Sequence, residues 1–110
     1  MEELVTVLPD VEGVRVIACA GEFDQDTLDP FSRAADLAVA DPTVRTIVVD
    51  LSRVTFADSS MLNALIRLRR TATPLVLAGP IPARLARLFE LTSAGQIFTI
   101  VDGLDAARAL

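Results

Sequence analysis

The feature that most constrains this chain is a short apolar run followed by a helical pattern. Residues 46–51 are rich in β-branched side chains and almost continuously apolar, which is typical of a strand covered on both faces in a parallel sheet. Leu62, Leu65 and Ile66 then recur at i, i+3 and i+4, which predicts one face of a helix. The sequence therefore predicts a buried strand, a link over residues 52–58 and a helix.

Strand and helix patterns alternate through the rest of the chain. Turn residues between the first two strand patterns predict an antiparallel hairpin, and the later alternation predicts parallel strands joined by right-handed crossovers. We therefore expect one α/β domain over residues 1–110, with a mixed, largely parallel sheet, an N-terminal hairpin and about four helices. The other strand patterns are residues 4–8, 14–20, 74–78 and 97–101.

The ends of the first and last helices carry specific predictions. Thr27 or Asp29 is expected near the start of the first helix, because such side chains suit a helix N-terminus. Asp102 is expected to cap a short terminal helix in the same way. In that last helix, three apolar residues are expected to face inward: Leu104, Ala107 and Leu110.

Three polar residues, Asp58, Ser59 and Ser60, lie where the central strand pattern leads into its helix. Asp58 or Ser59 is a natural N-cap, because its side-chain oxygen can accept a hydrogen bond from a free amide of the first turn. A helix start also accommodates a phosphate, because its amides and dipole favour negative charge. Capping and phosphorylation are compatible roles for this stretch.

Two loops are expected to share one edge of the sheet. Residues 21–27 and 55–60 each follow a strand pattern, and sites in open α/β folds lie at the carboxyl ends of the strands. Apolar residues at this edge are candidate anchors for a protein partner. They are Phe23, Phe56 and Met61. Core packing explains Phe56 better than a partner contact does. For Met61, packing against Leu65 and Leu68 is as good an explanation as a partner contact.

Composition excludes several classes of partner. Ten basic against fifteen acidic residues give a net charge of −5, so a nucleic-acid partner is not expected. No apolar run reaches the roughly 18 to 20 residues needed to cross a bilayer, so membrane insertion is not expected either. Met1-Glu2-Glu3 lacks the basic start of a signal peptide, which predicts a cytoplasmic protein.

The residue types present also argue against catalysis and metal binding. The chain contains no histidine, so a Ser-His-Asp arrangement cannot form, and no Gly-x-Ser-x-Gly pattern surrounds Ser59 or Ser60. Cys19 is the only cysteine, so an internal disulfide is impossible and a soft-metal site is not expected. We interpret Cys19 as a small buried apolar residue, and we predict a protein that is not an enzyme and needs no cofactor.

Four segments together resemble a known family. Residues 21–24 read Gly-Glu-Phe-Asp, residues 49–60 read Val-Asp-Leu-Ser-Arg-Val-Thr-Phe-Ala-Asp-Ser-Ser, residues 79–80 read Gly-Pro, and residues 88–92 read Leu-Phe-Glu-Leu-Thr. In this order they resemble STAS domains, specifically the stand-alone anti-sigma factor antagonists. The resemblance extends over essentially the whole chain, and its most specific part is residues 49–60.

The resemblance implies a partner-switching role in transcription regulation and the stress response. Members of this family bind an anti-sigma factor that is also a serine kinase, which releases a sigma factor. Phosphorylation of the first serine of the family's Asp-Ser-Ser-Gly-Leu pattern, here Ser59, abolishes binding, and a protein phosphatase reverses the modification. The implied partner-binding residues are Asp24, Asp58, Ser60, Met61 and Leu62.

Met61 departs from the family pattern, which has glycine at this position. Glycine lets a partner backbone approach closely, whereas methionine fills that space or offers an adaptable contact. The departure leaves partner choice and the efficiency of phosphorylation open. It also keeps an alternative open, in which the chain is a STAS accessory or scaffold module of a transporter or stress-signalling complex without sigma-factor partner switching.

Overall fold

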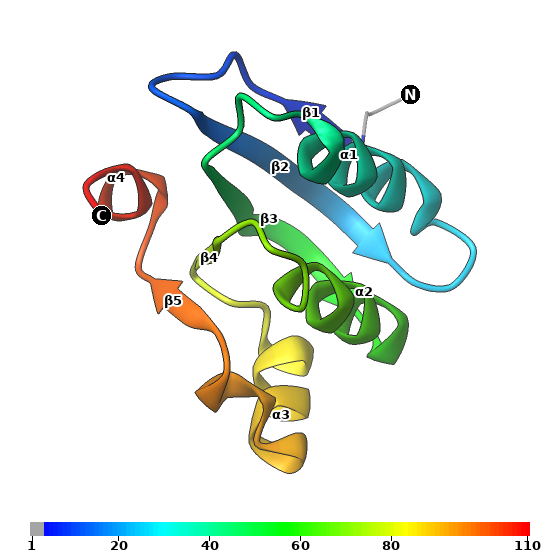
Figure 1. The fold of residues 1–110 in the computed structure, drawn as a ribbon. Helices are drawn as coiled ribbons and strands as arrows, with labels where there is room; N and C mark the ends of the chain where they lie inside the picture. Colours follow the sequence, from blue (N-terminus) through cyan, green and yellow to red (C-terminus); the bar gives the residue numbers. More distant parts are fainter. Residues whose placement is uncertain (1–3) are drawn as a thin grey trace.

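A five-stranded sheet with the sequential order β1-β2-β3-β4-β5 organises the computed structural model, which describes residues 4–110 (Figure 1). β1 is antiparallel to β2, and the remaining neighbours are parallel. The predicted mixed sheet with an N-terminal hairpin is therefore confirmed. The strands are β1 (Val5–Val7), β2 (Val14–Phe23), β3 (Thr46–Ala57), β4 (Leu75–Ala78) and β5 (Thr99–Val101).

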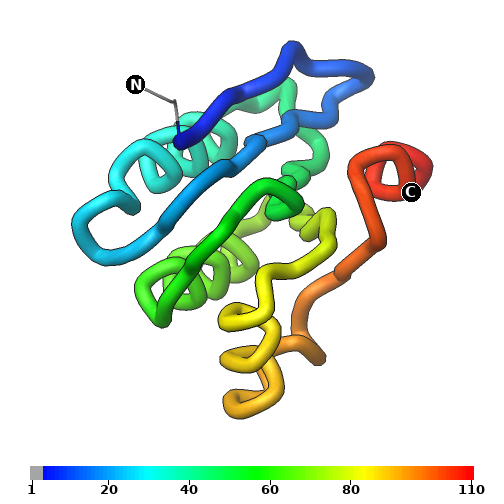
Figure 2. Tube along the Cα trace, turned by 180° about the vertical axis from the view of Figure 1, so that it is seen from behind, coloured from blue at the N-terminus to red at the C-terminus, as the bar shows by residue number. Residues whose placement is uncertain are grey.

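The helices cover the two faces of the sheet unequally. Each parallel strand pair is joined by one of the first three helices, and these three lie on one face because successive right-handed crossovers move along the sheet in one direction. Figure 2 shows the strands from behind, crossing in front of the first two helices. The helices are α1 (Asp29–Ala40), α2 (Ser59–Arg69), α3 (Ala83–Thr92) and α4 (Leu104–Arg108), and a 3-10 turn, η1 (Ala94–Gln96), follows α3.

The core consists of two clusters of apolar side chains, one on each face of the sheet. The larger cluster joins α1, α2 and α3 to the sheet, and the smaller one joins α4 to strands β2, β3 and β4. Cys19 lies in the larger cluster, as predicted, and burial together with the nearby Asp50 charge raises the pKa of its thiol to about 12. A thiol with so high a pKa is a poor nucleophile near neutral pH.

β3 is longer than the sequence predicted. The link expected at residues 52–58 is mostly strand, because β3 continues to Ala57 and stays paired with β2. Two irregularities in the β2–β3 register, at residues 18–20 and 21–22, allow this continuation. Gly21 has a φ of 89°, a left-handed conformation that glycine adopts at little cost.

Predictions about the helix ends were partly wrong. α1 begins at Asp29 as expected, but its N-cap is Leu28 and no side chain caps it. α4 has Gly103 as its N-cap, again without a side-chain cap, so Asp102 does not have the predicted role. Ala107 is buried as predicted, whereas Leu110 is 75% exposed because α4 ends at Arg108. Met1-Glu2-Glu3, on which the predicted cytoplasmic location depends, lies outside the described residues.

Arg15 links the hairpin to the end of α1. Its guanidinium lies 2.8 Å from an Asp10 carboxylate oxygen and 2.9 Å from an Asp41 carboxylate oxygen. The hydrogen bond from Arg15 lowers the pKa of Asp10. Hydrogen bonds from Thr43, and then the one from Arg15, lower the pKa of Asp41. These ion pairs lie near the amino end of β2, at the opposite end of that strand from the loop at residues 24–28.

We expect Arg15→Met to lower the melting temperature by a few degrees at neutral pH. We also expect the melting temperature of this variant to fall less than that of wild type as the pH is lowered. Since both carboxyl pKa values are lowered on folding, this stabilisation is present above the unfolded carboxyl pKa of ~3.9 and is lost as pH falls through the folded values. Thermal unfolding between neutral pH and about pH 3 measures the effect. Arg33→Met, at an exposed position of α1, is the control. Identical pH profiles for wild type and Arg15→Met would contradict the prediction.

Candidate functional site

The carboxyl ends of β2 and β3 bring the two predicted loops together. Phe23 and Ala57 are neighbours in the parallel register, and the amide of Asp58 donates to the carbonyl oxygen of Phe23 at 3.3 Å. The loop after β2 and the start of α2 therefore begin from adjacent positions. We call this region, residues 22–28 and 56–62, the loop edge.

Asp58, rather than Ser59, caps α2. Its backbone is extended, and its Oδ1 accepts a hydrogen bond from the amide of Ser60 at 2.9 Å. Its carbonyl oxygen accepts from the amide of Leu62 at 3.2 Å, which closes the first helical turn. The carboxylate thus satisfies one of the amides that a helix N-terminus otherwise leaves free, and it holds the backbone of Ser59 in place.

Ser59 is the first residue of α2 and its side chain is exposed. Within residues 4–110, the hydroxyl of Ser59 takes part in none of the side-chain hydrogen bonds of the loop edge. Ser60 is half-buried beside it. A hydroxyl that is exposed and not engaged in a hydrogen bond within the described chain is open to a modifying enzyme, and it lies at the positive end of the helix dipole.

Met61 and Leu62 point away from the surface. Met61 is fully buried and Leu62 is only 4% exposed, and both belong to the larger core cluster. Of the two interpretations of Met61, packing with Leu65 and Leu68 is the one found in the structure. Phe23 is fully buried as well. These side chains therefore support the loop edge from beneath and do not form its surface.

Asp24 braces the loop that follows β2. Its Oδ1 accepts hydrogen bonds from the amides of Asp26 at 2.8 Å and Thr27 at 3.1 Å. The Thr27 hydroxyl accepts from the amide of Asp24 at 2.9 Å and donates to the carbonyl oxygen of Glu22 at 2.9 Å. Sequence reasoning placed Thr27 at a helix start and missed this role, although an aspartate three residues before a threonine is typical of such side-chain turns.

Arg84 is a second residue that the sequence did not indicate. Its guanidinium carbon lies 5.1 Å from the ring centroid of Phe56, within the range of a cation–π contact. Phe56 is half-buried, so this arginine from α3 covers the apolar ring that would otherwise face the solvent. No local pattern could have paired them, because the two residues are distant in sequence and meet only where α3 packs against the end of β3.

Other kinds of site receive no support from the described residues. Residues 4–110 contain no group of three or more His, Cys, Asp or Glu side chains able to hold a metal ion. No helix in the described part of the chain is long and apolar enough to cross a membrane. Asp24 and Asp58 lie on the two adjacent loops, and each uses its Oδ1 to hold its own loop.

A family model and a solved structure indicate the same family. A family model described as Mlab, STAS domain matches residues 9–102. An anti-sigma factor antagonist from Mycobacterium paratuberculosis has a similar structure, with a TM-score of 0.81, 30% identity, and coverage of 96% of this chain and 92% of that chain. The comparison with curated proteins finds no match.

Two more distant structures show the same fold. The Bacillus cell fate determinant SpoIIAA in its phosphorylated form has a TM-score of 0.67 at 19% identity, with 96% of this chain and 97% of that chain covered. An anti-sigma-factor antagonist (STAS) domain protein from Planctomyces limnophilus has a TM-score of 0.77 at 16% identity, with 94% and 92% covered. At these identities the likeness supports the fold alone.

Proposed function

This chain belongs to the STAS-domain family, and on that basis we propose that it is an anti-sigma factor antagonist whose binding is switched off by phosphorylation of Ser59. The observation that carries the proposal is the exposed side chain of Ser59 at the first turn of α2. The similar Mycobacterium paratuberculosis protein is an anti-sigma factor antagonist, and SpoIIAA has a phosphorylated form. The first of these relatives supports the antagonist role, whereas SpoIIAA, at 19% identity, supports only the fold.

In the proposed mechanism, an anti-sigma factor with serine kinase activity, called the anti-sigma kinase below, covers the loop edge when Ser59 is unmodified. Because the anti-sigma kinase is then bound to this chain, a sigma factor is released from it. The same enzyme phosphorylates Ser59, and a protein phosphatase restores the binding form. All of these steps are proposed to occur in the cytoplasm, and the chain acts by binding and not by catalysis.

The residues of the loop edge have distinct proposed roles. Asp58 and Asp24 fix the two loops through their Oδ1 hydrogen bonds, which presents Ser59 and Ser60 to the partner. Met61 and Leu62 are buried, so we propose that they contribute to binding by anchoring the first turn of α2. This arrangement reduces the ordering that the loop edge must undergo on association.

A capture experiment tests the proposal. The unmodified protein and Ser59→Ala are expected to retain an anti-sigma kinase from their own cell, and Ser59→Asp is expected to lose it, because a charge is then enclosed without a partner. Gln96→Glu adds the same unit of charge at an exposed position on η1 and should retain the kinase. The captured protein is identified as an anti-sigma kinase by its ability to phosphorylate Ser59 with ATP.

Two outcomes would contradict the proposed function. In one, neither the unmodified protein nor Ser59→Ala captures an anti-sigma kinase, which would favour an accessory or scaffold role. In the other, Ser59→Asp captures the kinase as well as wild type does. A separate assay of the purified protein for esterase and phosphatase turnover tests the absence of catalysis.

A further inference from the structure

One face of α2 carries a row of polar and basic side chains that begins at the loop edge. Ser60, Asn63, Arg67 and Arg70 follow one another at intervals of three, four and three residues, so they share one side of the helix. They line an open groove of about 560 Å³ together with Gln25, Leu28 and Ile66. We call this the Arg67–Arg70 groove.

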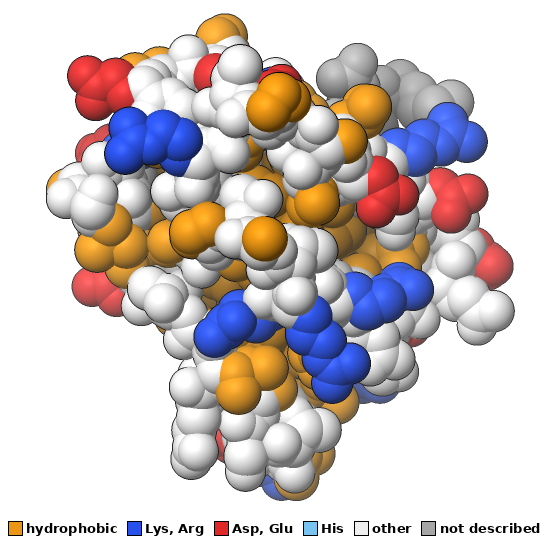
Figure 3. All heavy atoms as spheres, viewed as in Figure 1, with side chains coloured by type: hydrophobic (Ala, Val, Ile, Leu, Met, Phe, Trp, Pro, Cys, Tyr) orange, Lys and Arg blue, Asp and Glu red, His pale blue; other side chains and the backbone are white. Residues whose placement is uncertain are grey.

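The charge of this groove is opposite to that of the whole chain. Its lining includes two arginines and no carboxylate, although the net charge of the chain is −5. Figure 3 shows arginine side chains gathered over α2, with no acidic side chain among them. Both arginines are exposed, and the ion pairs found within residues 4–110 involve only Arg15 and Arg87 as cations.

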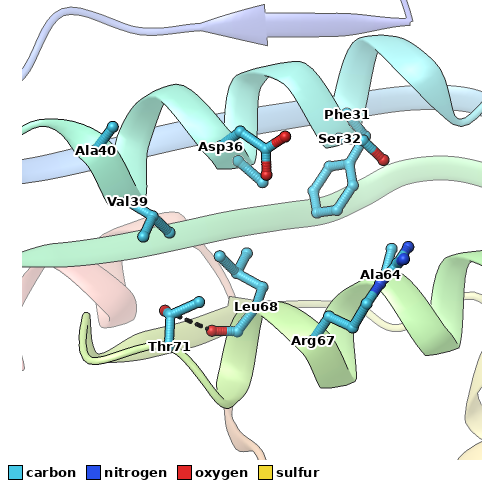
Figure 4. A pocket seen from close by; sticks show the side chains of 10 residues that line it. Phe31, Ser32, Asp36, Val39, Ala40, Ala64, Arg67, Leu68 and Thr71 are labelled. Carbon is cyan, nitrogen blue, oxygen red and sulfur yellow. Dashed lines mark hydrogen bonds between the residues drawn. The ribbon is translucent and has the colours of Figure 1, made fainter.

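A second hollow, on the other side of Arg67, is mainly apolar. It lies between α1 and α2, has a volume of about 390 Å³, and is lined mainly by apolar residues such as Phe31 and Leu68. Asp36 also lines it, and Figure 4 shows the Arg67 side chain extending from α2 into the space between the two helices. Because this hollow contains a carboxylate of its own, it suits an acidic ligand less well than the Arg67–Arg70 groove does.

Building on the proposed function, we propose that the Arg67–Arg70 groove binds an acidic segment of the anti-sigma kinase. Arginine guanidinium groups match carboxylates in bidentate geometry, and the amide side chains of Gln25 and Asn63 add hydrogen-bonding capacity. From Ser60 to Arg70 the helix rises about 15 Å. The bound segment would therefore be about five residues long if extended, or about ten if helical.

The Arg67–Arg70 groove begins beside the modification site and extends away from it along α2. Ser59 lies about 12 Å along the helix from Arg67, which exceeds the Debye length of ~8 Å at physiological salt. The carboxylates of Asp24 and Asp58 lie at the Ser59 end of α2. The acidic segment is therefore expected to place its carboxylates toward the Arg70 end, away from those of Asp24 and Asp58.

The test measures the affinity of the captured anti-sigma kinase for the unmodified full chain and for charge variants. Arg67→Glu/Arg70→Glu is expected to weaken binding by at least about tenfold and to flatten its dependence on salt between about 50 and 300 mM. Arg108→Glu places a charge reversal on α4 at an exposed position and should bind like wild type. Arg67→Gln/Arg70→Gln, which removes charge without reversing it, serves if the double glutamate variant does not fold.

Each outcome decides the proposal. Binding of both double variants within about twofold of wild type, or an equal loss for Arg108→Glu, would overturn the acidic docking groove and leave the antagonist role standing. If the unmodified chain captures no anti-sigma kinase at all, the antagonist role fails, and the groove assignment fails with it. A loss confined to the groove variants, with the salt dependence reduced, supports the assignment.

Discussion

Phosphorylation of Ser59 is expected to weaken binding of the anti-sigma kinase by about a hundredfold to a few thousandfold, while the domain stays folded. The phosphate adds up to two negative charges beside the Asp58 carboxylate that caps α2. At the exposed start of a helix this charge is favoured by roughly 0.3 to 1 kcal/mol. Enclosed against a partner without a matching cation, it costs ~3 to 5 kcal/mol by analogy with broken buried ion pairs.

Calorimetric titration of the kinase with unmodified and phosphorylated protein measures the change in affinity, and urea unfolding of the same two forms measures the change in stability. Ser59→Ala treated with kinase and ATP is the matched control, because it passes through the same reaction without gaining a phosphate there. Equal affinities of the two forms would refute the switch. A large drop in the free energy of unfolding on phosphorylation would show that the modification acts by disrupting the fold.

The element order was predictable from sequence because periodicity and turn residues report local structure. The apolar run at residues 46–51 is typical of a covered strand, and the Asp58-Ser59-Ser60 stretch is typical of a helix start. The length of β3 was not predictable in the same way. Its extension to Ala57 depends on pairing with β2 through two register irregularities, and a pairing partner is not visible in a local pattern.

In the candidate site, too, local features were predictable from sequence and tertiary contacts were not. Capping by Asp58 was one of the two possibilities that the strand-to-helix junction left open, Ser59 being the other. The brace between Asp24 and Thr27 and the contact of Arg84 with Phe56 depend on how loops and helices meet. The burial of Met61 was one of two open interpretations, because an apolar residue in a first helical turn can face either a partner or the core.

Met61→Gly is expected to lower the free energy of unfolding by about 3 to 6 kcal/mol. Deleting a fully buried methionine side chain removes its transfer free energy and leaves a cavity, which costs about 2 to 5 kcal/mol. Glycine within a helix adds about 1 kcal/mol relative to alanine. The glycine found at this position in related domains is therefore not interchangeable with Met61, because the core beneath α2 in this chain is built around the larger side chain.

Urea unfolding of wild type, Met61→Gly and Met61→Leu measures the effect, with the slope of each transition checked for two-state behaviour. Met61→Leu conserves volume and should cost less than about 1.5 kcal/mol. Because the Met61 side chain does not reach the surface, Met61→Leu should also bind the anti-sigma kinase as wild type does. A loss below about 1 kcal/mol for Met61→Gly would show that the core does not depend on this residue, whereas weakened binding by a stable Met61→Leu would return Met61 to the partner surface.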